Sequence, residues 1–240
     1  MNLYDTYPND ARHMAHYIAY QKRYAKNIRE SDKVLLDLIA RAPNAKTLLD
    51  IGCSTGNLLR HIHKAFPALA LTGGDLSDVQ LQECRNDAEL RGIRFEALDI
   101  RHLPPRRFDV VVANAILYGF ADEDFRAALR SMGGALNPGG RLLIFDFSHP
   151  FAQDVAIVER TQGFPDGHPL HFRPRATWEA ALAAAGCSDV QIRPFEIPVD
   201  LPGQGADSVA SYTLKTADAQ RLLFRGIIFQ PWSHIVAIKA

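Results

Sequence analysis

Three aspartates and one asparagine follow the apolar segments of this chain, at spacings that could bring them around one ligand. Asp50 ends the first apolar run, and Asp75, Asp99 and Asn114 end or follow the next three. If these runs are parallel strands of an α/β sheet, their carboxyl ends open on one crevice, where ligands bind in such folds. Carboxylates at that place repel phosphate and suit a ligand that carries amine or hydroxyl groups.

A glycine turn joins Asp50 to a helical pattern. The segment reads D-I-G-C-S-T-G, and its glycines, Gly52 and Gly56, would let a ligand lie against bare backbone at a helix N-terminus. A phosphate-binding loop needs G-K-[S/T], but here Gly56 is followed by Asn57. A dinucleotide loop needs glycine where this chain has Ser54 and Asn57. The sequence therefore excludes the first kind of loop and disfavours the second.

Each of these polar side chains also has a purely structural interpretation. Asp75 could meet a ribose, or it could cap the helix expected to begin at Ser77 or Asp78. Asp99 could line the site, or it could pair with Arg101 at the surface. Taken together, the strand-end positions indicate a ligand site more strongly than any one of them does alone.

The composition disfavours several classes of protein. The 240 residues include 27 basic and 27 acidic side chains, so the formal net charge is zero and nucleic acid is not expected as a partner. The N-terminal residues do not resemble a signal peptide, and the longest apolar stretch, residues 110–120, is too short to span a bilayer. Cys53, Cys84 and Cys187 are not paired with His at metal-ligand spacing. We expect reduced thiols, no metal, no membrane contact and a cytoplasmic location.

Expected strands and helices alternate from Thr47 onward, which predicts a doubly wound α/β domain with a mostly parallel sheet. We expect residues 1–44 to form a Tyr-rich helical lid and residues 45–240 to form the domain. Within the domain, residues 151–175 are rich in Pro, Gly and His and predict a loop insertion, and residues 208–239 predict extra strands. The expected core strands cover residues 47–51, 70–74, 93–98, 108–113 and 141–147.

Five segments, in this order, resemble the motifs of the class I S-adenosylmethionine-dependent methyltransferases. They are D-I-G-C-S-T-G at 50–56, L-T-G-G-D-L-S at 71–77, A-L-D-I at 97–100, F-D-V-V-V-A-N-A-I-L-Y at 108–118 and L-N-P-G-G-R-L-L-I-F-D at 136–146. The first resembles the family pattern D/E-x-G-x-G-x-G, except that Ser54 replaces the middle glycine. The resemblance covers residues 47–147 well and the two ends of the chain only loosely.

The resemblance implies a doubly wound, mostly parallel seven-stranded sheet with helices on both faces, an N-terminal helical lid and antiparallel strands near the C-terminus. It also implies S-adenosyl-L-methionine as cofactor and S-adenosyl-L-homocysteine as product. Asp50 and the Gly52 backbone would hold the methionine moiety, and Asp75 would take the ribose hydroxyls. The other implied contacts are Cys53, Ser54, Thr55 and Gly56 in the loop, Leu76, Asp99 and Ile100 beside the adenine, and Asn114 and Ala115 near the sulfonium.

Side chains outside these motifs are the candidates for catalysis and for closure of the site. Tyr118 and His149 follow the fourth and fifth strands and should face the crevice. Neutral His149 could accept a proton near pH 7, or it could be a histidine in the turn made by Pro150. Tyr20 and Arg23 could close over the cofactor, with Arg23 reaching a carboxylate. Alternatively, the tyrosines of this helix pack on the sheet and Arg23 is solvated.

The residues after Asn114 narrow the choice of methyl acceptor. The chain continues Ala-Ile-Leu rather than the N-P-P-Y of related enzymes that methylate amide or base nitrogens, and Asn114 is a poor ligand for a catalytic magnesium ion. We therefore expect in-line methyl transfer to an oxygen or nitrogen of a small molecule. The tail strands could form the edge of a homodimer. The alternatives are a nicotinamide-dependent oxidoreductase and a non-catalytic methyltransferase-fold subunit, and the intact Asp50 and Asp75 argue against the latter.

Overall fold

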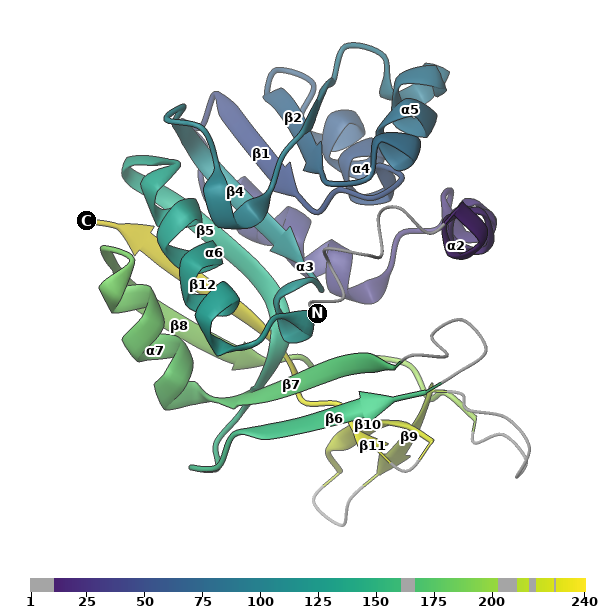
Figure 1. Cartoon of the computed structure of the whole chain (residues 1–240), viewed down its shortest axis with the longest axis vertical. Coiled ribbons are helices and arrows are strands. Elements are labelled where there is room, and N and C mark those ends of the chain that lie inside the picture. Colours follow the sequence, from purple (N-terminus) through teal and green to yellow (C-terminus); the bar gives the residue numbers. More distant parts are fainter. Residues whose placement is uncertain (1–10, 161–166, 203–210, 216–218, 227) are drawn as a thin grey trace.

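The computed structural model describes residues 11–160, 167–202, 211–215, 219–226 and 228–240. Its main sheet has the strand order β3-β2-β1-β4-β5-β12-β8 (Figure 1). The strands from β3 to β5 are parallel, and β12 is antiparallel to both of its neighbours. The predicted mostly parallel sheet with an antiparallel C-terminal strand is confirmed. The bounds are β1 Thr47–Ile51, β2 Ala70–Asp75, β3 Arg94–Ala97, β4 Phe108–Asn114, β5 Leu136–His149, β8 Cys187–Pro194 and β12 Trp232–Lys239.

Helices cover both faces of this sheet (Figure 1). Successive residues of β4 point to opposite faces, so Val110 and Val112 enter one core cluster while Val111 and Ala113 enter the other. A strand buried on both faces needs a continuous apolar run, which β4 has. The first face carries α3 (Glu30–Ala40), α4 (Asn57–Ala65) and α5 (Asp78–Asn86), and the second carries α6 (Asp122–Gly134) and α7 (Arg175–Ala184). Short 3₁₀ turns occupy η2 Ala88–Leu90, η3 Ile100–His102 and η4 Leu117–Gly119.

The predicted loop insertion at residues 151–175 is wrong. Within it, β6 (Val155–Glu159) and β7 (His168–Pro174) form an antiparallel pair, and β7 joins the end of β5 through Ser148 and His149. The Pro and His residues that suggested a loop lie in or beside these strands, at the margin of the sheet, where breaks in pairing are tolerated. Tertiary pairing with the end of β5 therefore overrides the local composition.

The predicted extra strands near the C-terminus are confirmed. Strands β9 (Ser211–Lys215), β10 (Arg221–Arg225) and β11 (Ile228–Phe229) form a small antiparallel sheet, which Figure 1 shows beside β6 and β7. Strand β12 then enters the main sheet between β5 and β8. In the described part of the chain, no helix combines the length and the apolar character needed to cross a bilayer.

The N-terminal helices differ in how they meet the domain. Leu35, Leu38 and Ile39 of α3 belong to the same core cluster as β1 and α4. Helix α2 (Ala11–Tyr24) instead lies beside α5, where the sulfur of Met14 accepts hydrogen bonds from the side chains of Ser77 and Gln80 (Figure 1). Tyr4 and Tyr7 lie outside the described residues. The proposed division of the chain at residue 44 stays a prediction.

The helix starts differ in how they are capped. Helix α3 begins at Glu30 with Arg29 at the N-cap, and α7 begins at Arg175 directly after Pro174. Ser77 does cap α5, because its hydroxyl accepts a hydrogen bond from the Gln80 backbone at 3.4 Å. That cap directs the start of α5 toward the end of β2.

Candidate functional site

The loop after β1 has a backbone that few side chains tolerate. Gly52 and Gly56 have φ values of 77° and 73°, and Ser54 has φ 52°. A Cβ on Gly52 would collide with the Ile116 side chain. Ser54 thus occupies the left-handed region that glycine adopts freely, which explains why the family pattern has glycine there. Such strain in a non-glycine residue is typical of functional loops.

Asp50 is the most unusual polar residue of the loop region. It is 2% exposed, and its Oδ1 makes no hydrogen bond to any described residue. Burial, reinforced by the nearby charges of Asp32 and Asp75, raises its pKa to about 8. Thr55 Oγ1 in the same loop is also buried and lacks a partner among the described residues. Because buried polar atoms are normally paired, these two atoms point to a ligand-binding site at this loop.

Asn114 holds an acid that the sequence analysis missed. Its side-chain amide donates to Asp32 Oδ1 at 2.9 Å, from the end of β4 to the first turn of α3. Asp32 is buried, and burial raises its pKa despite the Asn114 hydrogen bond. A signal existed in the sequence, since Asp32 lies three residues before Leu35 and therefore on the apolar face of α3. We call Asp32, Asp50 and Asp75 the acid cluster.

Asp75 connects the loop to the start of α5. Its carboxylate accepts hydrogen bonds from the backbone amides of Ser54 at 2.8 Å and Ser77 at 3.0 Å. Burial raises its pKa, and these hydrogen bonds oppose the rise. Asp75 therefore supports the helix start, as one interpretation predicted, and also supports the loop. Leu76, beside it, is half-buried.

Asp99 forms the surface pair that the sequence left open as an alternative. Its carboxylate accepts hydrogen bonds from the backbone and guanidinium of Arg101, which also reaches Asp124 at 3.5 Å. Partial burial would raise the pKa of Asp99, but Arg101 outweighs it and keeps the pKa below its ordinary value. The neighbouring Ile100 is buried in the core. The carboxylate of Asp99 is thus already paired, and its place beside the adenine stays a prediction.

Cys53 is buried in the loop next to Cys84. The Cys84 thiol donates to the Ser54 carbonyl at 3.2 Å, and a hydrogen bond between the two thiols together with burial raises the pKa of Cys53. A thiol with a raised pKa is a poor nucleophile at neutral pH. Cys53 therefore shapes the loop rather than supplying chemistry.

Helix α2 presents Tyr17, rather than Tyr20 or Arg23, to the loop. Tyr17 lies close to Ser54 and Gln21, and burial raises its pKa. Asn57 anchors the helix by donating to the Gln21 carbonyl at 3.2 Å and to Gln21 Oε1 at 3.1 Å. Tyr20 is 49% exposed and contacts Tyr24, and Arg23 is exposed. The geometry favours Tyr17 as the residue that closes over the loop, in contrast to the expectation for the other two.

Tyr118 is fixed by its backbone and by its ring contacts. Its amide and that of Leu117 donate to Asp146 Oδ2 at 3.1 and 2.8 Å. Its ring contacts those of Phe147 and Trp232 at centroid distances of 5.2 and 5.8 Å. Burial raises the pKa of Tyr118, so its hydroxyl stays protonated at neutral pH. The preceding Ala115 has φ 57°, which turns the chain sharply after Asn114.

Arg173 of β7 holds the same segment from the other side. Its guanidinium donates to the carbonyls of Leu117 and Phe120 and lies 3.7 Å from Asp122. Its charge also stabilises ionised Asp146, although burial still raises the pKa of that acid to about 7. Asp146 and Arg173 together form a buried frame for residues 117–120.

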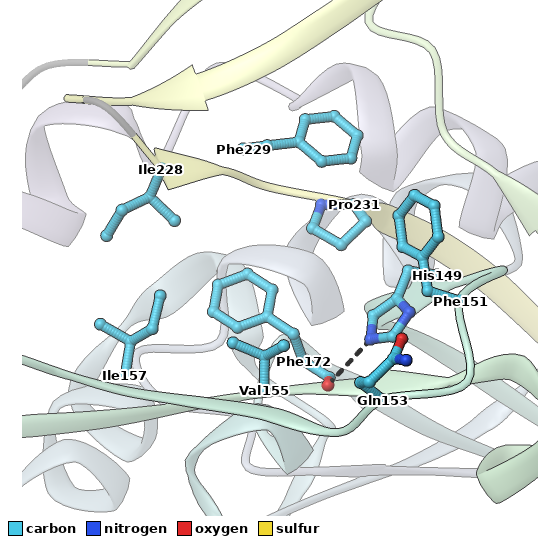
Figure 2. Close-up of a pocket in the computed structure, with 9 residues that line it drawn as sticks. All are labelled: His149, Phe151, Gln153, Val155, Ile157, Phe172, Ile228, Phe229 and Pro231. Atoms are coloured by element: carbon cyan, nitrogen blue, oxygen red, sulfur yellow. Dashed lines mark hydrogen bonds between the residues drawn. The ribbon is translucent and has the colours of Figure 1, made fainter.

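His149 lies apart from the end of β4. Asn114 pairs with Phe145, and His149 comes four residues later, about 13 Å along β5 at 3.3 Å per residue. His149 is buried, and its Nε2 contacts the Phe172 carbonyl at 3.0 Å. It lines an apolar cavity next to β6 and β7 (Figure 2). The expectation that Tyr118 and His149 face one crevice is therefore not met.

The acid cluster fits a cationic organic ligand. The charges of Asp32 and Asp75 add to the effect of burial on the pKa of Asp50, and an amine or sulfonium near Asp50 would relieve that repulsion. Within the described ranges, no three His, Cys, Asp or Glu side chains converge in a way that could hold a metal ion. The glycine cradle at Gly52 allows the ligand to approach the backbone closely.

Comparisons with known proteins agree with this geometry. A family profile described as a methyltransferase domain matches residues 48–140. The chain is 32% identical over 260 residues to a trans-aconitate 2-methyltransferase of Rhodopseudomonas palustris, covering 91% of this chain and 98% of that protein. It is 29% identical over 168 residues to the ubiquinone/menaquinone biosynthesis C-methyltransferase UbiE of Desulfotalea psychrophila, covering 68% of this chain and 67% of that protein.

Solved structures share the fold at low identity. The aminopentose methyltransferase CalS10 of Micromonospora echinaspora, with S-adenosylmethionine bound, aligns with a TM-score of 0.59 and 21% identity, covering 92% of this chain and 97% of that one. Human N-acetylserotonin methyltransferase in complex with the same cofactor aligns with a TM-score of 0.64 and 15% identity, covering 98% of this chain and 58% of that one.

Proposed function

Because this chain belongs to the class I S-adenosylmethionine-dependent methyltransferases, we propose that it methylates an oxygen or nitrogen atom of a small molecule. The main support for the proposed position of the cofactor is Asp50, whose buried carboxylate has an unpaired oxygen at the glycine loop. An amine is a group that would pair with such a carboxylate by a charge-assisted hydrogen bond. The methionine end of the cofactor would therefore lie at Asp50.

The other loop and strand-end residues would hold the rest of the cofactor. The backbone of Gly52 to Gly56 would line the methionine moiety, and Asp75 would accept from the ribose hydroxyls. Leu76, Asp99 and Ile100 would border the adenine, and Asn114 and Ala115 would lie near the sulfonium. S-adenosylmethionine supplies a methyl group on a positively charged sulfur, which an acceptor takes by in-line displacement.

The chain's main contribution would be alignment of the acceptor with that methyl group. Tyr17 on α2 and Tyr118 after β4 approach the site from two sides, and both have raised pKa values caused by burial. Both hydroxyls would therefore act as hydrogen-bond donors rather than as bases near neutral pH. Holding the reactants in line accounts for much of the rate enhancement in a reaction of this kind.

The acceptor atom is proposed from the sequence around Asn114 and not from the relatives. The relatives named above include a C-methyltransferase and a trans-aconitate methyltransferase, so they do not agree on one acceptor. The segment Asn114-Ala115-Ile116-Leu117 lacks the N-P-P-Y motif of amide and base methylation. Mass spectrometry of a methylated product, with fragmentation to locate the added methyl group, would identify the atom.

Calorimetry with S-adenosylhomocysteine tests the cofactor site. We expect saturable binding to the unmodified chain, weaker binding to Asp75→Ala and unchanged binding to Asp78→Ala, which removes an exposed acid from the next helix. Asp75→Asn separates the two roles of Asp75, because its amide oxygen can still accept one backbone hydrogen bond. Unchanged affinity in Asp75→Ala would show that the segment at residues 71–77 is wrongly assigned to the ribose.

The same assay separates the alternative functions. A nicotinamide-dependent oxidoreductase would bind nicotinamide cofactors, whereas we expect no response to them. A non-catalytic subunit would bind the cofactor without forming S-adenosylhomocysteine in the presence of any acceptor. Absence of binding of both S-adenosylmethionine and S-adenosylhomocysteine would contradict the enzyme and its site together.

A further inference from the structure

An apolar cavity of about 490 Å³ lies between the β6–β7 pair and β11 (Figure 2). That volume is within the range of small-molecule sites. Among the described residues that line it, none is Asp, Glu, Lys or Arg. The lining residues are His149, Phe151, Gln153, Val155, Ile157, Phe172, Ile228, Phe229 and Pro231.

His149 gives this apolar cavity one polar contact of defined character. Its Nε2 lies 3.0 Å from the Phe172 carbonyl oxygen, which can only accept, so Nε2 carries the hydrogen of the neutral ring (Figure 2). Nδ1 is then an acceptor, and it has no hydrogen-bond partner among the described residues. The side chain is 6% exposed. A ligand in the cavity would satisfy Nδ1 by donating an O–H or N–H hydrogen.

A series of aromatic rings packs between the cavity and Tyr118, which follows β4. Phe172, which lines the cavity, stacks on Phe147 at a centroid distance of 4.5 Å, and Phe147 contacts Tyr118 at 5.2 Å. The strand register puts His149 about 13 Å beyond Asn114. A molecule that reaches from one place to the other must be elongated.

We propose that this cavity holds the apolar body of the methyl acceptor, an uncharged, elongated molecule with a hydroxyl or amine group that donates to His149. This inference rests on the proposed methyltransferase function. It makes His149 a positioning residue, because the group it binds lies at the end of the acceptor away from the methyl group. The atom that is methylated is therefore a different one.

The same geometry argues against a polyanionic acceptor such as the one named for the Rhodopseudomonas palustris relative. Among the described residues, the two arginines on strands beside the cavity, Arg173 and Arg225, already have hydrogen-bond or ion-pair partners. Arg173 donates to the carbonyls of Leu117 and Phe120 and lies near Asp122, and Arg225 pairs with Glu159 at 3.1 Å. Carboxylates placed among apolar side chains without a cation would carry a large desolvation cost.

Binding of 1-naphthol, an uncharged aromatic hydroxyl compound, tests the cavity without any need for the cofactor. We expect saturable binding that Ile157→Trp abolishes by filling the space. Val158→Trp is the matched control, because Val158 lies on the opposite face of β6 and is 55% exposed. The affinity of all three proteins for S-adenosylhomocysteine should be equal.

His149 variants test the hydrogen bond. His149→Phe should weaken 1-naphthol about tenfold and leave 1-methoxynaphthalene, which has no donor, unchanged. His149→Gln should restore 1-naphthol binding, because its amide can both donate to the Phe172 carbonyl and accept from the ligand. Melting temperatures of the variants show whether each is folded. Equal weakening of both probes by His149→Phe would contradict the assigned hydrogen bond.

An activity assay links the cavity to the acceptor. We expect S-adenosylhomocysteine formation with 4,4′-dihydroxybiphenyl, which carries a hydroxyl at each end, and its loss in Ile157→Trp but not in Val158→Trp. Absence of saturable 1-naphthol binding would overturn the proposal, as would turnover of trans-aconitate that survives Ile157→Trp. Because probe binding is measured without cofactor, these outcomes are distinct from a failure of the cofactor site itself.

Discussion

The acid cluster and the apolar cavity have different effects on the stability of the ligand-free protein. Asp50 is buried with an unpaired oxygen and a pKa raised to about 8, whereas the cavity is lined almost wholly by apolar side chains. A buried, unpaired carboxylate opposes folding, and an apolar wall that a ligand covers only partly does not. The difference indicates that the acid cluster recognises a charged ligand, whereas the cavity recognises an uncharged ligand by its shape.

Residues 117–120 lie between the two regions, because Tyr118 is close to Tyr17 and contacts Phe147, which stacks on the cavity residue Phe172. The largest effect should come from breaking the support of this segment. Arg173→Met would leave the Leu117 and Phe120 carbonyls and Asp146 without their buried cation, at a cost of about 3–5 kcal/mol. We expect a melting temperature lower by roughly 10 °C and weaker binding at both sites. The control is Arg126→Met, which removes a more exposed partner of the same Asp122. A change at one site only would show that the segment does not link them.

Asp50→Asn should separate the two regions. It should weaken S-adenosylhomocysteine binding about 100-fold, or ~2.7 kcal/mol, and leave 1-naphthol binding unchanged. It should also stabilise the ligand-free protein at pH 8 by at least about 1 kcal/mol, because a buried charge is removed. Calorimetry and thermal unfolding measure the two effects. A destabilised variant with normal cofactor affinity would show that Asp50 is structural.

The acid cluster should also make stability and binding depend on pH. The pKa of Asp50 is raised from about 3.9 to about 8 on folding, so the folded state holds more protons and the free energy of unfolding falls as pH rises across that range. A cationic ligand favours ionised Asp50, so its binding near pH 7 should release a proton from that carboxyl group. The binding free energy should therefore become more favourable as pH rises, by up to about 1.4 kcal/mol per pH unit. Calorimetry in buffers of different ionisation enthalpy measures this release, which Asp50→Asn should abolish. The probe 1-naphthol should bind without releasing a proton.

The smallest expected effect distinguishes Tyr17 from Tyr20. Tyr17→Phe should weaken S-adenosylhomocysteine binding a few-fold, or about 0.5–1.5 kcal/mol, because one hydrogen bond is lost near Ser54. Tyr20→Phe should have no effect, since Tyr20 is 49% exposed. A larger effect of Tyr20→Phe than of Tyr17→Phe would support the expectation from the sequence that Tyr20 closes over the cofactor.

The sequence predicted the cofactor side of the protein well because its signals are local. Strand ends, the Gly52–Gly56 turn and the start of α5 at Asp78 each depend on neighbours within a few residues, and the structure has all three. Asp32 was missed because its burial depends on Asn114, 82 residues away. Tyr17 was passed over because Tyr17, Tyr20 and Tyr24 recur at helical spacing on one side of α2, and only the contact with Ser54 distinguishes Tyr17 from the other two.

The region around the apolar cavity was predicted poorly for a physical reason of the same kind. Strand β7 carries Pro and His, which locally disfavour a strand, and it forms because it pairs with β6 and with the end of β5. The sequence placed His149 just after the fifth expected strand, and in the structure it is the last residue of β5. Its surroundings could not be deduced, because Phe172, Ile228 and Pro231 reach it from three other segments.

The place of β12 has a consequence for how the chain folds during synthesis. Strand β12 lies between β5 and β8, although both of those are made before it. Strands β3 to β5 can assemble as the chain emerges, and β5 then presents an unpaired edge until residues 232–239 arrive. An exposed edge of this kind can pair with another nascent chain. Slow synthesis of the segment between β8 and β12 should therefore favour aggregation, and faster completion should increase the yield of folded protein.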